Sequence, residues 1–350
     1  MKRKIMAEIK AGIVGATGYT GSELVRLLAQ HPNVTIEFVT SESYKGQSLA
    51  AVHPHLHDTV DITLISASEI DDYNPDVLFL ALPHGVSMDY VKKWSDRDFS
   101  IIDLSGDFRF KDPAMYEKWY NKSHSAPELI TDAAYGMPEL FRDDIRNAKL
   151  VANPGCYPTS SILALAPLIK HDFINPTSII VDSKSGVTGA GAKPKKGLHF
   201  PNVFGNFSAY SLKSHRHTPE IEATLNAHSG FSTEVLFTPH LLPIDRGILT
   251  TTYSTPKKRV STEMVEELFH SVYEKEHFVR VFDEPPALKN IRGSNFCDIY
   301  ATYDERTHRI ITVSVIDNLV KGAAGQAVQN MNIMFGLIES SGLRHFPLSP

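Results

Sequence analysis

The sequence predicts an α/β protein, with a Rossmann-type dinucleotide-binding domain followed by an α+β domain whose sheet is mostly antiparallel. Three observations support this prediction. Apolar strand-like runs alternate with helical segments over the first 105 residues, a glycine-rich turn directly follows the first run, and beyond about residue 155 strand-like runs succeed one another with few helices between them. A chain of 350 residues is expected to form two domains at roughly 150 residues each.

The first domain is expected to contain strands at residues 9–14, 34–40, 77–82 and 100–104, because each is a short apolar run beside turn residues. A helix follows the first strand, where Thr20 and Glu23 have the spacing of a capping box and three leucines fall on one face. A further helix is expected through residues 88–94.

The second domain is expected to contain more strands than helices. Its strand-like runs lie at residues 178–182, 234–238, 248–254 and 278–282, and two further runs at 296–303 and 309–316 have the pattern of a hairpin. A helix is expected at 263–276, and another at 321–339, where apolar residues recur at helical spacing.

Composition excludes several classes of protein. With 42% hydrophobic and 21% charged residues the chain is not disordered, and no apolar run reaches the roughly 18 residues of a membrane span. The first residues lack the apolar region of a signal peptide. A net charge of −5 argues against a nucleic-acid or anionic-membrane partner, and two cysteines exclude a disulfide framework and a cysteine-based zinc site. We expect a soluble, cytoplasmic protein.

The glycine turn is the first candidate site. Gly12, Gly15, Gly18 and Gly21 recur every three residues between the first strand and its helix. Glycines there allow a tight turn and let the backbone approach a pyrophosphate at the helix N-terminus. The alternative is a strand-to-helix turn that binds no ligand, but its place in an α/β pattern favours a dinucleotide.

The end of the second strand bears on which dinucleotide binds. An acidic residue there usually holds the ribose 2′-hydroxyl of NAD. In this chain Ser41, Ser43 and Lys45 would suit the 2′-phosphate of NADP, whereas Glu42 keeps NAD open. The residues favour NADP.

Cys156 is the candidate nucleophile. It follows an Asn-Pro-Gly turn and precedes an apolar run, so it is expected at a helix N-terminus, where free N–H groups and the helix dipole stabilise a thiolate. The alternative is a structural cysteine, which is the interpretation we give to Cys297 in its strand-like run.

The segment 215–220, HRHTPE, offers a proton partner for that thiolate. His215 and His217 flank Arg216, and Glu220 lies three residues after the second histidine, where it is placed to orient an imidazole. Among 16 histidines coincidence is a real alternative. A metal site at His53, His55 and His57 is a weaker alternative, because these residues alternate in a loop-like stretch.

Two other segments have the composition of ligand-binding loops. Residues 105–109 follow a strand, where ligands gather in open α/β sheets, and Arg109 there is suited to a carboxylate or phosphate. Residues 185–191 are rich in glycine, which suits either an anion-binding loop or a flexible crossing between domains.

Taken together, these motifs resemble the N-acetyl-γ-glutamyl-phosphate reductases, the arginine-biosynthesis branch of the semialdehyde-dehydrogenase superfamily. The resemblance runs from about residue 9 to residue 335 and rests on the ordered segments GIVGATGYTGSELVRLL, LALPHG, DLSGDFR, YGMPEL, NPGCYPT, SGVTGAG, HRHTPE, FTPHLLPIDRGIL and DNLVKGAAGQAVQNMN. One departure is Ala192, where the family pattern leads us to expect arginine, so any contact made by that residue is in doubt.

The resemblance implies reduction of an acyl phosphate to an aldehyde by NADPH, with release of phosphate. It implies Cys156 as the nucleophile and His217 or His215 in acid–base catalysis; we favour His217 because Glu220 follows it closely. The predicted cofactor-binding residues are Gly15, Ala16, Thr17, Gly18, Tyr19, Thr20, Ser41, Ser43, Pro83, Asn318 and Lys321. The predicted substrate-binding residues are Ser105, Arg109, Asn153, Ser185, Gly186 and Arg216. No metal is expected.

The resemblance also implies the domain boundaries and the assembly. Residues 1–155 together with a C-terminal helix at about 320–350 would form the dinucleotide-binding domain, and residues 156–319 the catalytic and substrate domain. We expect a homo-oligomer, a dimer or tetramer, with the open face of the second sheet as a natural contact. The remaining alternatives are a sister enzyme acting on aspartyl or carrier-linked aminoadipyl phosphate, a glyceraldehyde-phosphate-type dehydrogenase, and a dinucleotide sensor without catalysis.

Overall fold

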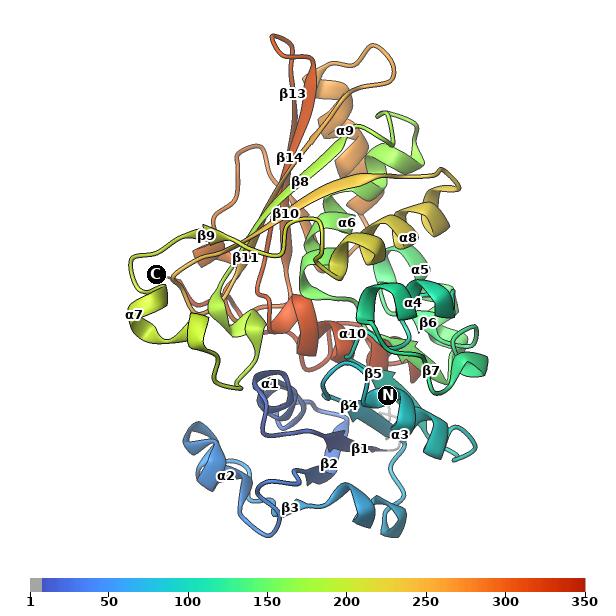
Figure 1. Ribbon diagram of the computed structural model, residues 1–350, viewed down its shortest axis with the longest axis vertical. Helices are drawn as coiled ribbons and strands as arrows, with labels where there is room; N and C mark the ends of the chain where they lie inside the picture. The colour runs from blue at the N-terminus through green and yellow to red at the C-terminus, as the bar shows by residue number, and fades with distance from the viewer. Residues whose placement is uncertain (1–7, 350) are drawn as a thin grey trace, which may run out of the picture. The chain divides into compact units, whose positions relative to one another are not determined.

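The computed structural model describes residues 8–349, and these form two compact units (Figure 1). The first unit comprises the residues up to Pro154 together with Ala323–Arg344, and the second comprises Gly155–Gly322 together with residues 345–349. The sequence led us to expect the whole C-terminal segment in the first domain, and this does not hold for residues 345–349. They join the second unit, where the Leu348 N–H donates a hydrogen bond to the Arg292 carbonyl oxygen at 2.8 Å.

The first unit is built on a parallel sheet with the strand order β3-β2-β1-β4-β5-β7-β6. Its central strands are apolar and buried on both faces, as parallel strands covered by helices require. The order of the chain reverses between β1 and β4, which marks a topological switch point. The strands are β1 (Ile9–Val14), β2 (Val34–Thr40), β3 (Leu64–Ile65), β4 (Val77–Leu80), β5 (Ser100–Asp103), β6 (Ala134–Tyr135) and β7 (Leu150–Ala152).

The helices of the first unit confirm the expected alternation of strand and helix. They are α1 (Tyr19–Leu28), α2 (Leu49–Val52), α3 (Ser87–Trp94), α4 (Pro113–Tyr120), α5 (Pro138–Asn147) and α10 (Gly325–Met334), with 3₁₀ turns at Pro54–Leu56, Ala67–Asp72 and Pro127–Leu129.

The start of α1 differs from the predicted capping box. Gly18 is the N-cap residue and makes no side-chain cap, so Thr20 already lies inside the first helical turn. The Glu23 carboxylate instead accepts a hydrogen bond from Arg26 at 2.7 Å. The helix therefore begins at Tyr19, earlier than it would if Thr20 were the N-cap residue.

Helix α10 is shorter than expected and is buried on every side. It covers Gly325–Met334, after a π-helical turn at Val320–Ala324, rather than the whole of 321–339. The helix packs against α1, α5 and β5. Its polar side chains take partners inside the unit: the Asn330 amide donates to the Gly136 carbonyl oxygen at 2.9 Å and to Asn153 Oδ1 at 3.1 Å. The apolar residues at helical spacing therefore do not mark a single buried face, because the polar residues of this helix are buried as well.

The second unit contains a mixed sheet with the order β12-β13-β14-β11-β8-β10-β9. The β8–β10 and β12–β13 pairs are parallel and the other four pairs are antiparallel, which confirms a mostly antiparallel sheet. The strands are β8 (Ile179–Ser185), β9 (Ser208–Ala209), β10 (Val235–Leu241), β11 (Ile248–Ser254), β12 (Val279–Val281), β13 (Cys297–Asp304) and β14 (Arg309–Ile316). The predicted hairpin is β13–β14.

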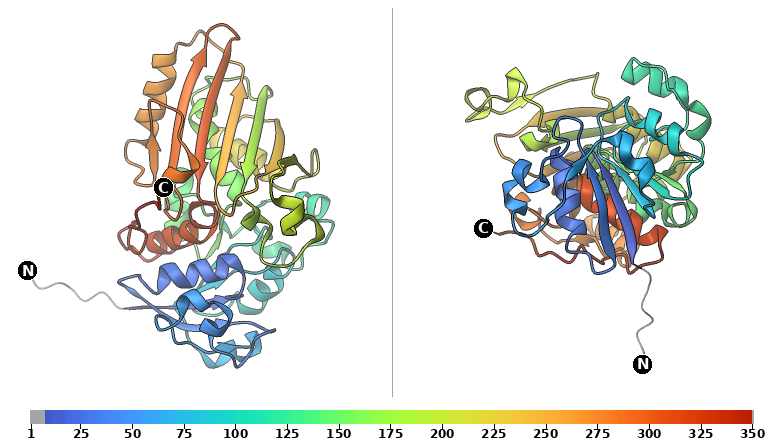
Figure 2. Two further views of the ribbon diagram at one scale, coloured as in Figure 1. Left: turned by 90° about the vertical axis from the view of Figure 1, so that its left-hand side faces the viewer. Right: turned by 90° about the horizontal axis from the view of Figure 1, so that it is seen from below.

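One face of this sheet is covered and the other is bare. Helices α6 (Cys156–Lys170), α8 (His217–Ser229) and α9 (Thr262–Tyr273) pack on the covered face, and the broad sheet surface turned to the viewer in Figure 2 (left) carries no helix over most of its strands. Burial alternates along β8 and β11 accordingly. The remaining short elements are α7 (Phe200–Val203) and 3₁₀ turns at Val187–Ala190, Lys196–Leu198 and Leu288–Asn290.

Among the helices of residues 8–349, none has both the length and the apolar character needed to cross a membrane.

Candidate active site

Cys156 is the first residue of α6, as the sequence predicts. Gly155 is the N-cap residue, and its carbonyl oxygen accepts hydrogen bonds from the Thr159 N–H and hydroxyl, both at 2.9 Å. The thiol is partly exposed. The N–H groups of a first helical turn lack intrahelical acceptors and form the positive end of the helix dipole, so they favour an anionic sulfur at this position.

Glu220 joins the start of α8 to the start of α6. Its side chain is buried, and Oε1 accepts a hydrogen bond from the Gly155 N–H at 2.8 Å. This contact is with the backbone directly before Cys156 and ties the turn of the candidate nucleophile to α8. The role of Glu220 in orienting His217 stays a prediction.

The two histidines of the HRH segment differ in their environments. His217 is the first residue of α8, and its N–H donates to His215 Nδ1 at 3.2 Å. Their rings lie 4.8 Å apart, and both meet the Tyr157 ring edge-on. Burial, with a smaller contribution from the Arg216 charge, lowers the pKa of His215 to about 4. His215 is therefore neutral at pH 7, and the choice between His217 and His215 as the acid–base residue stays a prediction.

Tyr157 and Tyr210 both pack against His215, and their hydroxyl groups bond to each other. Their oxygen atoms lie 3.0 Å apart, and the Tyr157 hydroxyl also donates to the His240 carbonyl oxygen at 3.1 Å. Burial raises the pKa of Tyr157 far above its usual value and that of Tyr210 to about 12. Both phenols are neutral at physiological pH and hold the segment before His215 against α6.

Gly322, in the segment after β14, lies close to the candidate nucleophile. The sequence did not lead us to expect this contact. A Cβ atom built on Gly322 would lie 2.9 Å from Cys156 Cβ and 3.2 Å from its Cα. Only glycine lets this segment pass so close to the cysteine. A glycine in a Lys-Gly-Ala-Ala run carries no local signal for such a long-range contact.

The other predicted residues of the second unit line a loop junction. Ser185 is buried and donates to the Gly186 carbonyl oxygen at 3.0 Å. The Asn318 side chain accepts a hydrogen bond from the Gly247 N–H at 2.7 Å and donates one to the Thr188 hydroxyl at 2.9 Å. It therefore connects the turn after β14 to the glycine-rich loop at residues 185–191.

Lys321 and Arg216 have opposite exposures. The Lys321 side chain is fully buried, with Nζ 5.7 Å from the centre of the Phe278 ring. Arg216 is exposed beside the histidines. Roles for Lys321 toward a nicotinamide and for Arg216 toward a substrate stay predictions.

The glycine turn of the first unit has the geometry of a phosphate cradle. Gly15 has a φ of +89°, and a Cβ there would lie 2.5 Å from the Ala81 carbonyl oxygen. A Cβ on Gly21 would lie 2.3 Å from the Gly15 carbonyl oxygen. The turn therefore packs tightly against the residue that follows β4 and against the start of α1. Gly18 is the N-cap residue of that helix. These residues fit a dinucleotide pyrophosphate.

The neighbouring residues of this turn differ in exposure. Thr17 lies 3.3 Å from Ser41, measured between their hydroxyl oxygens, which ties the turn to the end of β2. Ser41 itself is buried and Ala16 is buried, whereas Tyr19, Ser43 and Pro83 are exposed and Thr20 is partly exposed.

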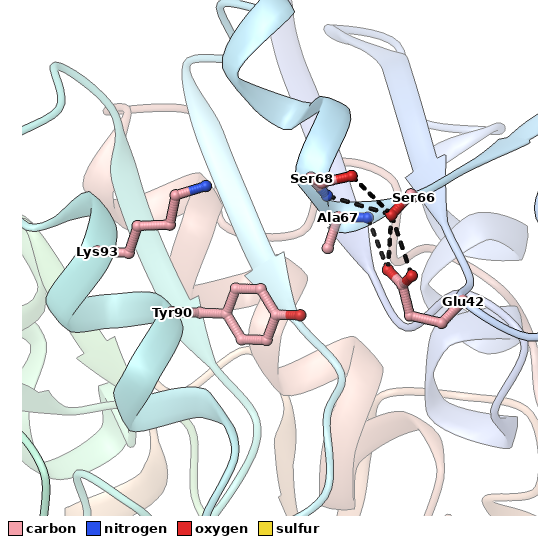
Figure 3. A pocket seen from close by; sticks show the side chains of 6 residues that line it. All are labelled: Glu42, Ser66, Ala67, Ser68, Tyr90 and Lys93. Atoms are coloured by element: carbon pink, nitrogen blue, oxygen red, sulfur yellow. Dashed lines mark hydrogen bonds between the residues drawn. The ribbon is translucent and has the colours of Figure 1, made fainter.

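Glu42, directly after β2, is exposed, and its carboxylate is nevertheless hydrogen-bonded within the unit. Its carboxylate accepts hydrogen bonds from the Ser66 hydroxyl at 3.0 Å and from the Ala67 N–H at 2.8 Å, as Figure 3 shows. Ser66, Ala67 and Ser68 line a pocket together with Glu42, Tyr90 and Lys93.

The predicted substrate residues of the first unit are buried in its scaffold. Arg109 donates to the Asn153 and Leu104 carbonyl oxygens at 2.8 and 2.9 Å, and the Ser105 hydroxyl donates to Asp103 at 2.8 Å. Burial, with repulsion from Asp107, raises the pKa of Asp103 to about 7. The contacts shown for Ser105, Arg109 and Asn153 are structural, and their roles toward substrate stay predictions.

The histidines of the loop-like stretch have separate partners. His53 contacts the Ala16 carbonyl oxygen, His55 contacts Ser22, and His57 contacts Asp58. Within residues 8–349, no three histidine, cysteine or acidic side chains gather as a metal site.

Comparison with known proteins matches both halves of the chain to semialdehyde dehydrogenase domains. Residues 10–148 match the family described as "Semialdehyde dehydrogenase, NAD binding domain", and residues 156–318 match "Semialdehyde dehydrogenase, dimerisation domain". The fold is similar to the crystal structure of aspartate semialdehyde dehydrogenase II from Vibrio cholerae, with a TM-score of 0.73 at 18% identity, covering 93% of this chain and 98% of that chain.

Relatives with much higher sequence identity indicate the branch of the family to which the chain belongs. The chain is 52% identical to the N-acetyl-gamma-glutamyl-phosphate reductase of Symbiobacterium thermophilum over 338 residues, which cover 96% of this chain and 97% of that protein. It is 50% identical to the reductase of the same name from Pelotomaculum thermopropionicum over 339 residues, with 96% and 97% coverage. The chain therefore belongs to the semialdehyde dehydrogenase family and, within it, to the N-acetyl-γ-glutamyl-phosphate reductases.

Proposed function

We propose that this chain reduces N-acetyl-γ-glutamyl phosphate to N-acetylglutamate 5-semialdehyde, with NADPH as the reductant and phosphate as the second product. The reaction is a step of arginine biosynthesis. The observation that carries the proposal is Cys156 in the first turn of α6, anchored through Gly155 to Glu220, in a family of reductases of this name.

NADPH, when bound, supplies the hydride for the reduction. The chain's own part is to hold it: the turn from Gly15 to Thr20 presents N–H groups at the start of α1 for the pyrophosphate. The absence of a Cβ at Gly15 and at Gly21 lets the loop close onto β4 and the helix, which keeps those N–H groups together.

Cys156 carries the first chemical step. Its thiolate attacks the acyl carbon, a carbon–sulfur bond forms, and the carbon–oxygen bond to phosphate breaks, so that phosphate leaves and a thioester remains on the enzyme. Backbone N–H groups of the first turn of α6 are placed to stabilise the negative charge that builds up on the carbonyl oxygen. Glu220 supports this geometry by fixing the Gly155 N–H.

His217 serves the second step. Once the thioester carbon is reduced, its oxygen carries negative charge, and His217 donates a proton to it. When the thiohemiacetal collapses, the hydroxyl proton returns to His217 and the carbon–sulfur bond breaks, which releases the aldehyde and restores the thiolate. His215 acts as the neutral acceptor that fixes the His217 backbone N–H. Positioned acid–base catalysis of this kind typically contributes about 10²–10⁴ in rate.

The bare face of the second sheet is the proposed contact with a second copy of the chain. Ile180 and Leu236 are exposed there, on adjacent strands β8 and β10, in the domain whose family description is "dimerisation". An exposed apolar sheet face of this kind is typical of an oligomer contact. The assembly is then a dimer, or a tetramer built from dimers.

We place the reaction in the cytoplasm, a reducing compartment in which a catalytic thiol such as that of Cys156 stays reduced.

The test of the function is phosphate-dependent reduction of NADP⁺ with N-acetylglutamate semialdehyde, with Cys156→Ser as the matched control. Activity that requires phosphate and is lost in the Cys156→Ser variant supports the proposal. Aspartate semialdehyde is assayed beside it, and a higher kcat/KM with that substrate would contradict the assigned specificity.

A further inference from the structure

The carboxylate of Glu42 is held by the chain itself. It accepts hydrogen bonds from the Ser66 hydroxyl at 3.0 and 3.2 Å to its two oxygens, and from the Ala67 N–H at 2.8 Å. In Figure 3 the carboxylate is turned toward the start of the 3₁₀ turn Ala67–Asp72, and the Tyr90 hydroxyl faces it across the pocket. We refer to the contact of Glu42 with Ser66 and Ala67 as the Glu42 clasp.

The clasp has a physical basis in the local backbone. Ser66 is extended, with φ −78° and ψ 150°, and the N–H groups that follow it open a helical turn and need acceptors. Glu69 takes the Ser66 N–H at 2.9 Å from the other side and is itself paired with Lys45 at 2.7 Å. Charged hydrogen bonds of this kind are stronger than neutral ones, so they hold the carboxylate of the exposed Glu42 at Ser66 and Ala67.

An acid at the end of the second strand is the residue that usually accepts the ribose hydroxyls of NAD and disfavours the 2′-phosphate of NADP. In this chain that acid is already bound. We infer that the Glu42 clasp sets the dinucleotide preference, by withdrawing Glu42 from the ribose and so leaving room for a 2′-phosphate beside the exposed Ser43. The inference rests on the proposed binding of the dinucleotide at the glycine turn.

The clasp can be opened without touching the glycine turn. Ser66→Ala removes the hydroxyl donor. Ala67→Pro removes the N–H donor, and proline is tolerated there because it would occupy the first position of a helical turn and follow an extended residue. The matched control is Ser68→Ala, since the Ser68 hydroxyl bonds to the Ser66 hydroxyl rather than to the Glu42 carboxylate.

The experiment measures the dissociation constants of NADP⁺ and NAD⁺ by calorimetry on the full-length protein, with thermal melts to establish that each variant is folded. In the Ser66→Ala/Ala67→Pro variant, the preference for NADP⁺ over NAD⁺ should fall about tenfold, because a freed Glu42 binds the ribose hydroxyls and repels the phosphate. Adding Glu42→Gln to that variant should restore most of the preference for NADP⁺. Ser68→Ala should leave the ratio unchanged.

Three results would overturn the inference. The first is an unchanged ratio in a folded double variant, and the second is a fall in the ratio that persists when Glu42→Gln is added. The third is weaker binding of NAD⁺ in the single variant Glu42→Gln, because Glu42 would then already contact the ribose in the wild type. Wild-type protein that binds neither dinucleotide would contradict the proposed function itself, and the inference with it.

Discussion

Glu220 accepts a hydrogen bond from the backbone N–H of Gly155 at 2.8 Å, so a buried carboxylate of α8 fixes the residue that precedes Cys156 at the start of α6. The two residues are 65 positions apart in the sequence. This contact joins the two helix N-termini that carry the candidate nucleophile and the candidate acid–base residue.

Removing the Glu220 carboxylate should therefore impair catalysis. In Glu220→Ala the Gly155 N–H loses its charged acceptor, and a buried hydrogen bond to a charged group contributes about 1.5–3 kcal/mol, so kcat/KM should fall by roughly 10- to 100-fold. Glu220→Gln is the matched control, because its amide oxygen can still accept from Gly155, and it should retain more activity than the alanine variant. Equal steady-state kinetics for the wild type and Glu220→Ala would refute the positioning role.

The two histidines should differ in their effect on rate. His217→Ala should lower kcat by about 10²–10⁴, the usual contribution of positioned acid–base catalysis. His215→Asn keeps an acceptor near the His217 N–H and removes a ring that is already neutral, so it should lower kcat less than tenfold. A larger loss in His215→Asn than in His217→Ala would reverse the assignment.

The low pKa of His215 also predicts a pH-dependent stability. The folded protein binds a proton at His215 only near pH 4, whereas an unfolded histidine binds it near 6.5, so between these values the unfolded state holds more protons. The free energy of unfolding should then fall as the pH drops from about 6.5 toward 4.

Urea unfolding at several pH values measures this effect. His228 shares the same direction and the same approximate pKa, so the contribution of His215 is the difference between the wild type and His215→Asn. That difference should favour the variant increasingly as the pH falls through this window. A difference that does not change with pH would show that His215 is protonated at the same pH in both states.

Gly322→Ala should disturb the nucleophile directly. The added Cβ would lie 2.9 Å from Cys156 Cβ, which real side chains do not tolerate, so the segment or the cysteine must shift. We expect a loss of kcat together with a changed rate of thiol alkylation by iodoacetamide. Gly197→Ala is the control, because a Cβ there meets no atom within 4 Å. Unchanged alkylation and turnover in a folded Gly322→Ala protein would argue against this close contact.

Local patterns were sufficient for much of the fold. The strand at 9–14, the helix start at Cys156 and the hairpin β13–β14 depend on neighbours in sequence: a buried apolar run, an Asn-Pro-Gly turn, and two alternating runs across a short turn. The fold class followed from their order along the chain.

Contacts between distant segments could not be predicted in this way. The partner of Glu220, the approach of Gly322 to Cys156, and the capture of Glu42 by Ser66 each join segments that only the folded backbone brings together. The hydrogen bonds of Arg109 to the carbonyl oxygens of Leu104 and Asn153 are likewise contacts that the sequence does not predict. Helix α10 is buried on every side because other elements surround it, a property that its own periodicity does not encode.

The central claim is that Cys156 carries the acyl group between the two chemical steps. The most direct measurement is the mass of the intact protein, and of its Cys156 peptide, after brief incubation with N-acetyl-γ-glutamyl phosphate without NADPH, beside the phosphate released. The account predicts one N-acetylglutamyl group on Cys156 and one phosphate released per active site, with neither in Cys156→Ser. An acyl group on another residue, or catalytic turnover that persists in Cys156→Ser, would contradict it.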